Sequence, residues 1–259
     1  MPRNGLGIVC LACCLLGSSA VRSVAQDLFE LEVFEYESSA PGEFEVEFHS
    51  NGMPRGSASG DSRAANHRPV HMSVEVTRGW TKKLETALFV QTAPFGSPGS
   101  VRFAGGHLRA KYQFGELGAL PVRLAASAEY AFNHAVFDHE LQTFEIRGIV
   151  DVERGRLLLV ANPSLEVVTR GADATLEPVF DVSARAGWKL SRRLTSVTDY
   201  FSAAATTRHL LPQPNAHHLL FTGARVDLAP GWEFEASVGH CLTRGGEPWL
   251  MKSVIGYSF

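Results

Sequence analysis

Charged residues recur at every second position in several segments of this 259-residue chain. In 142–152, for example, Glu145, Arg147 and Asp151 are separated by apolar residues and a glycine. Residues two apart on a β-strand share one face, so these charges would lie on one side of a sheet. There they could pair across neighbouring strands, or line a polar, slightly acidic conduit. The charged residues that follow this pattern are Glu75, Glu85, Arg109, Lys111, Arg123, Glu129, Glu145, Arg147, Asp151, Asp181, Arg185, Lys189, Glu233, Glu235 and Lys252.

Residues that could hydrolyse a substrate or bind a metal do not form a specific constellation. Ser237 and His240 share one segment, but residues three apart on a strand point to opposite faces, and no Gly-x-Ser-x-Gly motif occurs. Two His, one Asp and one Glu crowd 134–140, where they could bind zinc or copper, although a solvated polar loop explains them more simply. We therefore expect no catalytic residue, no cofactor and no metal site, and we do not expect an enzyme.

The elements that would position the charged residues are short β-strands. Apolar and polar residues alternate, and there is almost no helical periodicity. Short segments of period two at regular spacing are typical of a β-sandwich or barrel, and they predict about 12 strands in one all-β domain. The segments fall at 43–50, 70–77, 82–92, 103–114, 122–133, 142–152, 156–168, 180–189, 194–204, 217–227, 232–242 and 249–259.

The connections between these segments alternate in length. Short ones lie near 78–79, 115–120, 153–156, 191–193 and 229–231, and longer ones near 51–69, 93–102, 133–141, 169–177, 205–216 and 243–248. Transmembrane β-barrels have an even number of antiparallel strands, short periplasmic turns and longer outer loops. The sorting of the connections therefore favours a single antiparallel transmembrane barrel over a soluble sandwich.

The last strand carries the most specific pattern. Trp249, Met251, Ile255, Tyr257 and Phe259 fall on one face at period two, and the chain ends on the aromatic residue. This ending resembles the last strand of bacterial outer-membrane β-barrels. The resemblance implies a location in the outer membrane, with outer-membrane lipid as one partner. It also implies that Tyr257 and Phe259 form an assembly signal read by the barrel-assembly machinery.

The amino terminus has the features of a secretory signal peptide at 1–25. Arg3 precedes an apolar run from Leu6 to Leu16, and small residues at 23 and 25 fit a cleavage site before Gln26. Two of the 24 bases and no acid lie in this leader, so the mature chain would carry 22 bases against 27 acids. A mildly acidic chain without a basic cluster argues against nucleic acid as a partner. Only Cys241 would remain, which excludes an intrachain disulfide.

The mature chain is predicted to begin with a separate segment, 26–42, before a barrel at 43–259. Acidic and apolar residues alternate in 28–37, and Pro41-Gly42 ends the pattern. The segment could be an added strand, a periplasmic arm, or a plug folded into the pore. A plug is compatible with the bases expected inside the barrel.

Aromatic residues near the strand ends predict two girdles at the bilayer interfaces. At one end lie Trp80, Trp188 and Trp232, together with Phe114, Tyr257 and Phe259, and at the other Phe132, Tyr200, Phe201 and Trp249.

Together these patterns predict a porin-like outer-membrane barrel for passive transport of small hydrophilic solutes or ions. Its lumen would be lined by the charged face described above. The alternatives are a structural or adhesion-type barrel with a closed lumen, an outer-membrane lipid hydrolase, and a soluble periplasmic lipid carrier.

Overall fold

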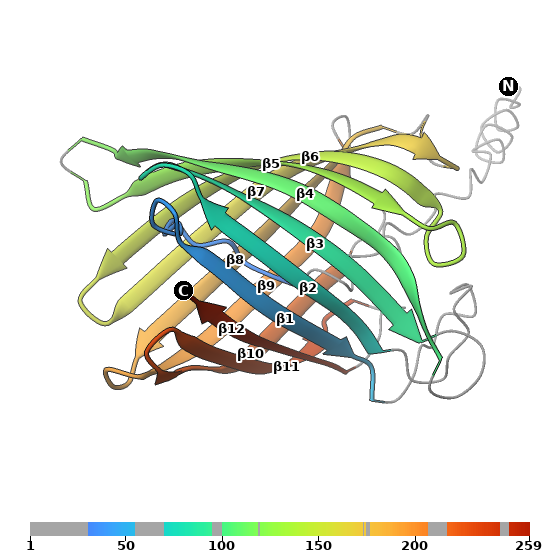
Figure 1. The fold of residues 1–259 in the computed structure, drawn as a ribbon. Helices are drawn as coiled ribbons and strands as arrows, with labels where there is room; N and C mark the ends of the chain where they lie inside the picture. The colour runs from blue at the N-terminus through green and yellow to red at the C-terminus, as the bar shows by residue number, and fades with distance from the viewer. Residues whose placement is uncertain are drawn as a thin grey trace, which may run out of the picture.

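The computed structural model describes residues 31–54, 70–94, 100–118, 120–172, 174, 177–206, 217–243 and 249–259, and these contain twelve β-strands (Figure 1). Within these ranges no helix has the length and apolar character needed to cross a membrane. The strands are β1 (Phe44–Gly52), β2 (Val70–Gly79), β3 (Leu84–Pro94), β4 (Val101–Glu116), β5 (Arg123–Asn133), β6 (Glu140–Arg154), β7 (Leu157–Gly171), β8 (Val179–Lys189), β9 (Leu194–Thr206), β10 (His217–Ala229), β11 (Trp232–Cys241) and β12 (Leu250–Ser258).

The strands close into one barrel. Each pairs antiparallel with its neighbours in sequence, and β1 pairs with β12 in a register that matches Glu45 to Ser258. Backbone hydrogen bonds finish the seam: Phe44 N donates to Phe259 O at 2.9 Å, and Phe259 N donates to Phe44 O at 2.8 Å. A closed sheet leaves no strand edge with unpaired N–H and C=O groups, which is the condition for crossing lipid. The predicted closed barrel of about 12 antiparallel strands is confirmed.

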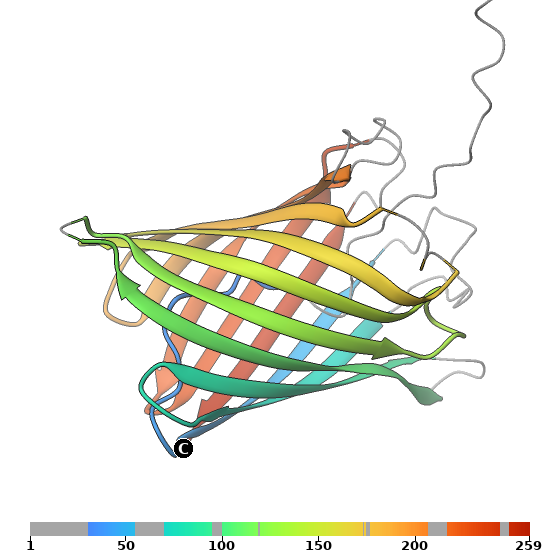
Figure 2. The same cartoon turned by 90° about the horizontal axis from the view of Figure 1, so that it is seen from above.

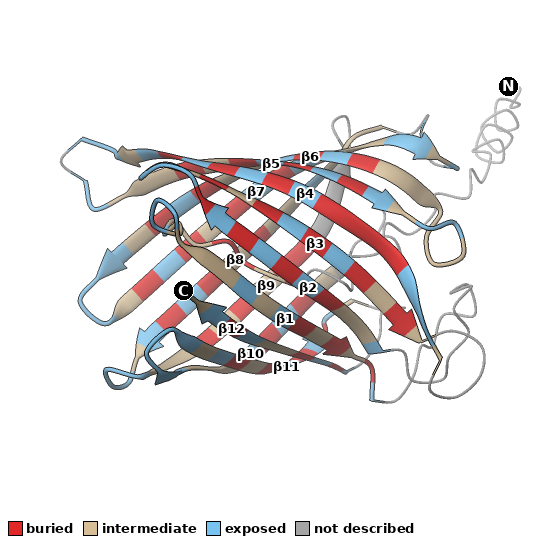
Figure 3. Cartoon of the chain, in the orientation of Figure 1, coloured by how far each residue is buried: buried red, intermediate tan, exposed pale blue. Residues whose placement is uncertain are grey.

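Exposed and buried residues alternate along the strands (Figure 3). In β6, for example, Phe144 and Ile146 are exposed while Glu145 is buried. In an isolated barrel the buried positions face inward and the exposed ones face outward. The outward positions are therefore mostly apolar and the inward ones mostly polar or charged, which is the inverse of a soluble protein and is suited to surrounding lipid.

The connections are sorted by length between the two ends of the barrel. We call the end with connections 80–83, 117–122, 155–156, 190–193 and 230–231 the short-turn end, and the opposite end the long-loop end. Glycines with positive φ make the two tightest turns possible, at Gly155 (65°) and Gly231 (77°). The first strand starts and the last strand ends at the short-turn end, where the carboxyl terminus lies (Figure 1).

The residues before β1 lie inside the barrel. We call 31–39 the inner segment; it runs along the interior and turns back at 40–42 into β1 (Figures 1 and 2). At the turn, Gly42 N donates to Gly79 O at 2.9 Å, and Glu43 N donates to Ala40 O at 2.9 Å. Of the arrangements left open by the sequence, the described part of this segment therefore occupies the position of a plug. The predicted signal peptide at 1–25 lies outside the described residues.

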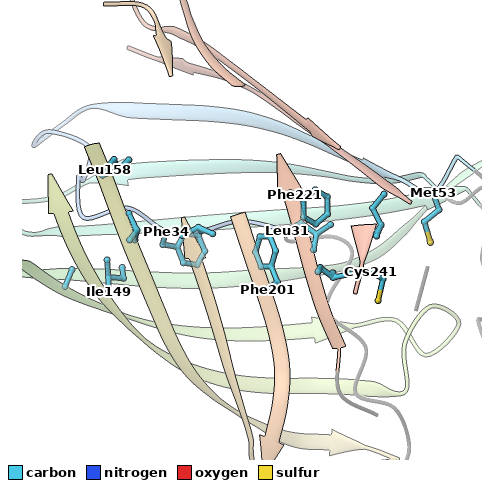
Figure 4. Close-up of a cluster of buried hydrophobic side chains, with 13 residues drawn as sticks. Leu31, Phe34, Met53, Ile149, Leu158, Phe201, Phe221 and Cys241 are labelled. Carbon is cyan, nitrogen blue, oxygen red and sulfur yellow. The ribbon is translucent and has the colours of Figure 1, made fainter. Parts of the chain in front are cut away.

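An apolar cluster joins the inner segment to the wall (Figure 4). Leu31 and Phe34 are buried here, together with Phe201 and Phe221, whose rings meet edge to face at 5.7 Å between centroids. Phe201 was predicted to lie in an outer aromatic girdle, and that prediction is wrong, because its side chain is 1% exposed and points inward. Neighbouring residues on a strand face opposite sides, and Tyr200 takes the other face, where its hydroxyl lies 2.6 Å from His218 Nδ1.

Candidate functional site

The backbone of the inner segment is held by side chains of the barrel wall. Asn162, at the centre of β7, accepts a hydrogen bond from Phe34 N at 2.8 Å and donates one to Phe34 O at 3.0 Å. Gln113 Nε2 donates to Tyr36 O at 2.8 Å, and Lys252 Nζ donates to Leu31 O at 3.3 Å. An extended segment without a partner strand needs such contacts, because buried backbone groups are costly when left unpaired. The wall thus binds the backbone of the inner segment as well as its side chains.

A cluster of charges, which we call the central cluster, ties the middle of the inner segment to the wall. Glu35 Oε1 accepts from Arg185 Nη1 at 3.0 Å and from Arg225 Nη1 at 2.7 Å. Arg185 also forms a two-point contact with Asp199, at 2.7 and 2.9 Å, and contacts Glu235 at 2.7 Å. The remaining member is Lys252, which pairs with Asp199 and, at 3.1 Å, with Glu235.

The charge balance of the central cluster keeps Glu35 ionised. Burial by itself would raise the pKa of this carboxyl, but Arg225 and Arg185 outweigh burial and hold the pKa below its ordinary value. Glu35 is part of the inner segment and not of a strand, so this ion pair is a contact between the inner segment and the wall. Removing one partner of a buried ion pair is costly, because the other charge is left uncompensated.

Aromatic side chains of the inner segment stack on wall arginines. The guanidinium of Arg109 lies 4.1 Å from the ring centre of Phe34, and that of Arg147 lies 4.4 Å away. Near the short-turn end, Arg123 lies 4.8 Å from the ring centre of Tyr36. Each cation–π contact of this kind contributes about 0.5–2 kcal/mol, depending on how dry it is.

The structure distributes the predicted lumen residues over several groups. Glu85, Arg109, Lys111, Glu129, Glu145, Arg185, Glu235 and Lys252 are buried, while Arg123, Arg147 and Asp181 are partly buried. Arg185, Glu235 and Lys252 meet in the central cluster. Several of the others form separate ion pairs, such as Lys111 with Glu85 at 2.9 Å and Glu129 with His107 at 2.9 Å. No single site contains them all.

Several residues of the site escaped the sequence analysis, among them Asp199, Arg225 and Asn162. Asp199 and Arg225 belong to segments whose alternation is irregular, because inward-facing Phe201 and Phe221 interrupt the polar face. Asn162 carries no charge, so a search for charged residues could not find it. Asp199 also lies two residues from Val197 and Phe201, so in the sequence it shares its face with apolar residues, although all three are buried.

A cavity of about 320 Å³ lies between the inner segment and the wall. Among the described residues, its lining includes ten glutamates and five basic residues, three of which are Arg185, Arg225 and Lys252 of the central cluster. Such an excess of carboxylates gives the space a negative potential and favours cations over anions.

One group of side chains beside this cavity has the donor types of a metal site. The described residues contain one such group, Glu32, Glu47, His49 and Glu75, whose nearest ligand atoms all lie within 4.8 Å of one another. Burial, with further contributions from Glu75 and Glu47, raises the pKa of Glu32 to about 8. By contrast, the polar groups in 134–140 serve local contacts: His134 Nδ1 accepts from Val136 N at 3.2 Å.

The fold and the distribution of its side chains define the class of protein. A closed antiparallel barrel with an apolar outer surface, a charged interior and connections sorted by length is the architecture of porin-like outer-membrane barrels. The protein has the fold of such outer-membrane β-barrels. Its short-turn end corresponds to the periplasmic end of the class.

Solved structures agree with this assignment. An outer-membrane channel from Pseudomonas putida F1 matches with a TM-score of 0.63 at 8% identity, over 89% of this chain and all of the other. A KdgM porin matches with a TM-score of 0.58 at 8% identity, over 83% of this chain and 99% of the other. A NanC porin matches with a TM-score of 0.56 at 9% identity, over 83% and 98%. At these identities the likeness is one of fold. No protein-family model matches the sequence, and neither does a curated protein.

Proposed function

We propose that this barrel is a channel for small hydrophilic solutes or ions, and that the inner segment controls its passage. The observation that carries the proposal is the polar cavity of about 320 Å³ between the inner segment and the wall. A barrel that served only as a scaffold would gain more from a dry, fully packed interior than from buried carboxylates, which are costly to desolvate. The excess of carboxylates on the cavity surface makes cations the favoured ions.

The inner segment is suited to be the moving part. It has no strand partner, and side chains from widely separated strands hold it, such as Asn162 on β7 and Arg225 on β10. Its release would leave the twelve interstrand ladders intact. After release of the inner segment, the basic residues that had paired with it would face water. Arg185 would also keep a carboxylate partner on the wall, Asp199.

A closed structural barrel is the second candidate function. The apolar cluster favours it, because Leu31 and Phe34 pack against inward-facing wall residues in the manner of a protein core. The two candidates separate on ion conductance in planar bilayers. A channel conducts, at least in brief openings, whereas a closed barrel stays silent in the wild type and in variants with a weakened inner segment.

An enzymatic role finds no support in the same geometry. Ser237 is buried inside the barrel, whereas His240 is exposed on its outer surface, so the pair cannot act as nucleophile and base. We therefore propose a non-enzymatic protein. Phospholipid and lipopolysaccharide that stay unaltered after incubation with the purified barrel are the expected result, and lipid turnover would contradict it.

Glu35→Gln tests control by the inner segment. The substitution keeps the size of the side chain but removes the charge that pairs with Arg185 and Arg225. Weakening a charged hydrogen bond by about 1.5 kcal/mol shifts the ratio of open to closed states roughly tenfold, so single-channel records should show more frequent or longer openings. Glu37→Gln is the matched control, because the Glu37 side chain is 70% exposed and its ion pair with Arg123 is therefore screened by water and contributes little. Equal open fractions in both variants would contradict the proposed role of Glu35.

We also propose that the terminal aromatics, Tyr257 and Phe259, serve as the signal for the barrel-assembly machinery. The Phe259 side chain is 62% exposed, and its ring stacks with Tyr257 at 5.7 Å and with Phe44 at 6.0 Å between centroids. Such exposure leaves the ring accessible to a receptor and limits its contribution to packing.

Phe259→Ala should lower the amount of assembled barrel in the outer membrane of cells. It should change spontaneous refolding into lipid vesicles much less, because no receptor takes part there. Phe114→Ala is the matched control, since Phe114 is 60% exposed at the same end of the barrel. Equal losses for both variants in cells would show that the terminal aromatic acts through stability and not through recognition.

A further inference from the structure

Four side chains from three elements converge next to the cavity at the inner segment. Glu32 comes from the inner segment, Glu47 and His49 from β1, and Glu75 from β2. Glu47 and His49 are two apart and so share the inward face, and Glu75 is the register partner of Glu47 on the neighbouring strand. The convergence therefore follows from the pairing of β1 with β2 and from the position of the inner segment.

Two distances at His49 are long for hydrogen bonds. His49 Nε2 lies 3.5 Å from Glu47 Oε2 and 3.4 Å from Glu75 Oε2, beyond the usual range for N–H···O contacts. They fit ligands of one ion better, because two atoms each about 2.0–2.2 Å from a tetrahedral zinc ion lie about 3.3–3.6 Å apart. The two edges at His49 thus have the length expected between ligands of one ion.

Buried polar atoms without a hydrogen-bond partner also support an ion in this group. Within the described part of the chain, Glu32 Oε2, His49 Nε2 and Glu75 Oε2 are all buried without a hydrogen-bond partner. His49 is 3% exposed and Glu75 is 1% exposed, so water does not replace the missing partners at the surface. Unpaired buried polar atoms are rare in native structures and call for an ion or a water.

The charge of the group in its metal-binding form suits a divalent cation. Three carboxylates face one guanidinium, Arg109, which pairs with Glu75 through Oε1 and leaves Oε2 directed at His49. Metal ligands bind in their deprotonated forms, and three carboxylates with a neutral imidazole beside Arg109 would leave two formal negative charges, which a divalent cation balances. Thr77 also donates to Glu75 Oε1, at 2.7 Å, and so helps to fix the orientation of the carboxylate.

We propose that Glu32, Glu47, His49 and Glu75 form a binding site for a divalent transition-metal ion, which fastens the inner segment to the barrel wall. One imidazole nitrogen with carboxylate oxygens suits Zn²⁺ or Mn²⁺ better than Ca²⁺ or Mg²⁺, which prefer oxygen ligands alone. Glu32, Glu47 and Glu75 line the cavity, so an ion that enters the cavity reaches the site directly.

Metal binding is tested on the purified full-length barrel, prepared without a histidine tag and treated with a chelator. Titration calorimetry with Zn²⁺, and the visible absorption of bound Co²⁺, should show one site per chain. His49→Gln and Glu32→Gln should each weaken Zn²⁺ binding more than about tenfold. Glu32 belongs to the inner segment and not to a strand of the wall, so its substitution should leave the β-sheet unchanged.

Glu37→Gln is the matched control, because Glu37 belongs to the same inner segment but lies outside the group and should leave Zn²⁺ affinity unchanged. Equal affinities in the wild type, His49→Gln and Glu32→Gln would mean adventitious binding only and would overturn the site. So would the absence of any bound ion.

The effect of the ion on passage rests on the proposed channel function and has a separate measurement. In planar bilayers, Zn²⁺ should lower the open fraction of the wild type, a chelator should restore it, and Glu32→Gln should not respond. A response that persists in Glu32→Gln would overturn the fastening of the segment by this site. If neither the wild type nor a variant without the inner segment conducts, the channel function fails while the calorimetric result for the site stands.

Discussion

Deleting residues 28–38 should raise the single-channel conductance of this barrel several-fold and abolish its closed states. The deletion removes all of the inner segment except Ser39 but leaves every interstrand ladder and the turn at Gly42 in place. Twelve strands enclose a wider lumen than the tightly filled eight-stranded barrels, so an emptied interior is open to water. Conductance in planar bilayers at fixed salt is the measurement.

The barrel should survive this deletion. Arg185 keeps its two-point contact with Asp199 and its contact with Glu235, and Arg123 keeps Asp151. The bases that lose a partner, such as Arg225, become exposed to the water of the open lumen, which removes most of the cost of an unpaired charge. A heat-dependent shift in gel mobility would verify that the deleted form is still a folded barrel.

A synthetic peptide of residues 28–39 provides the sharper control. Added on the short-turn side of the deleted barrel, it should restore the block, and the same peptide with Gln in place of Glu35 should block more weakly. Blocking by both peptides with equal strength would show that the lumen is obstructed without recognition of Glu35. Unchanged conductance after the deletion would contradict the role of the inner segment altogether.

The sequence predicted the barrel because two independent constraints produce the same pattern. The geometry of a strand alternates its side chains, and lipid on one side with water on the other selects apolar and polar residues in turn. Segment 142–152 shows the result: Ile146 faces outward and Glu145 inward, as its period of two indicates. The lengths of the connections alternate along the chain, and this alternation favoured a closed barrel with its short turns at one end.

The position of the inner segment could not be predicted in the same way. Its own alternation of acidic and apolar residues fits a strand, an arm or a plug, since Glu35 would be satisfied by water as well as by an arginine. The contacts that decide the matter are distant in sequence: Glu35 meets Arg225, 190 residues away. The inward positions of Phe201 and Phe221 depend on the same contacts, because they belong to the apolar cluster that contains Leu31.

The proposed metal-binding group, Glu32, Glu47, His49 and Glu75, could not be predicted from the sequence for a related reason. Glu47 and His49 are separated by a single residue, which is a visible signal, but two ligands are common by chance. Glu75 becomes the third only when the register of β1 against β2 is known, and Glu32 the fourth only when the inner segment lies inside the barrel. Local periodicity therefore reports which face a side chain occupies, and not which side chains meet there.

Ile146→Arg should be the most damaging single substitution on the outer surface. Ile146 is 53% exposed near the middle of β6, where its neighbours in register are Ala128 on β5 and Leu165 on β7. An arginine there would place its charge in the hydrocarbon, and at the bilayer midplane this costs about 2–4 kcal/mol. The free energy of unfolding, measured by urea titration of the barrel in lipid vesicles, should fall by about that amount.

Two controls separate charge and depth from the loss of an isoleucine. Ile146→Ala removes the apolar side chain without adding a charge, so it should cost clearly less than the arginine. Leu120→Arg adds the same charge at a residue of similar exposure, 57%, in the turn 117–122 at the end of the barrel, where the cost should be about 0–1 kcal/mol. Equal losses for Ile146→Arg and Leu120→Arg would mean that no hydrocarbon surrounds the middle of the barrel. The outward apolar face would then need another explanation than lipid.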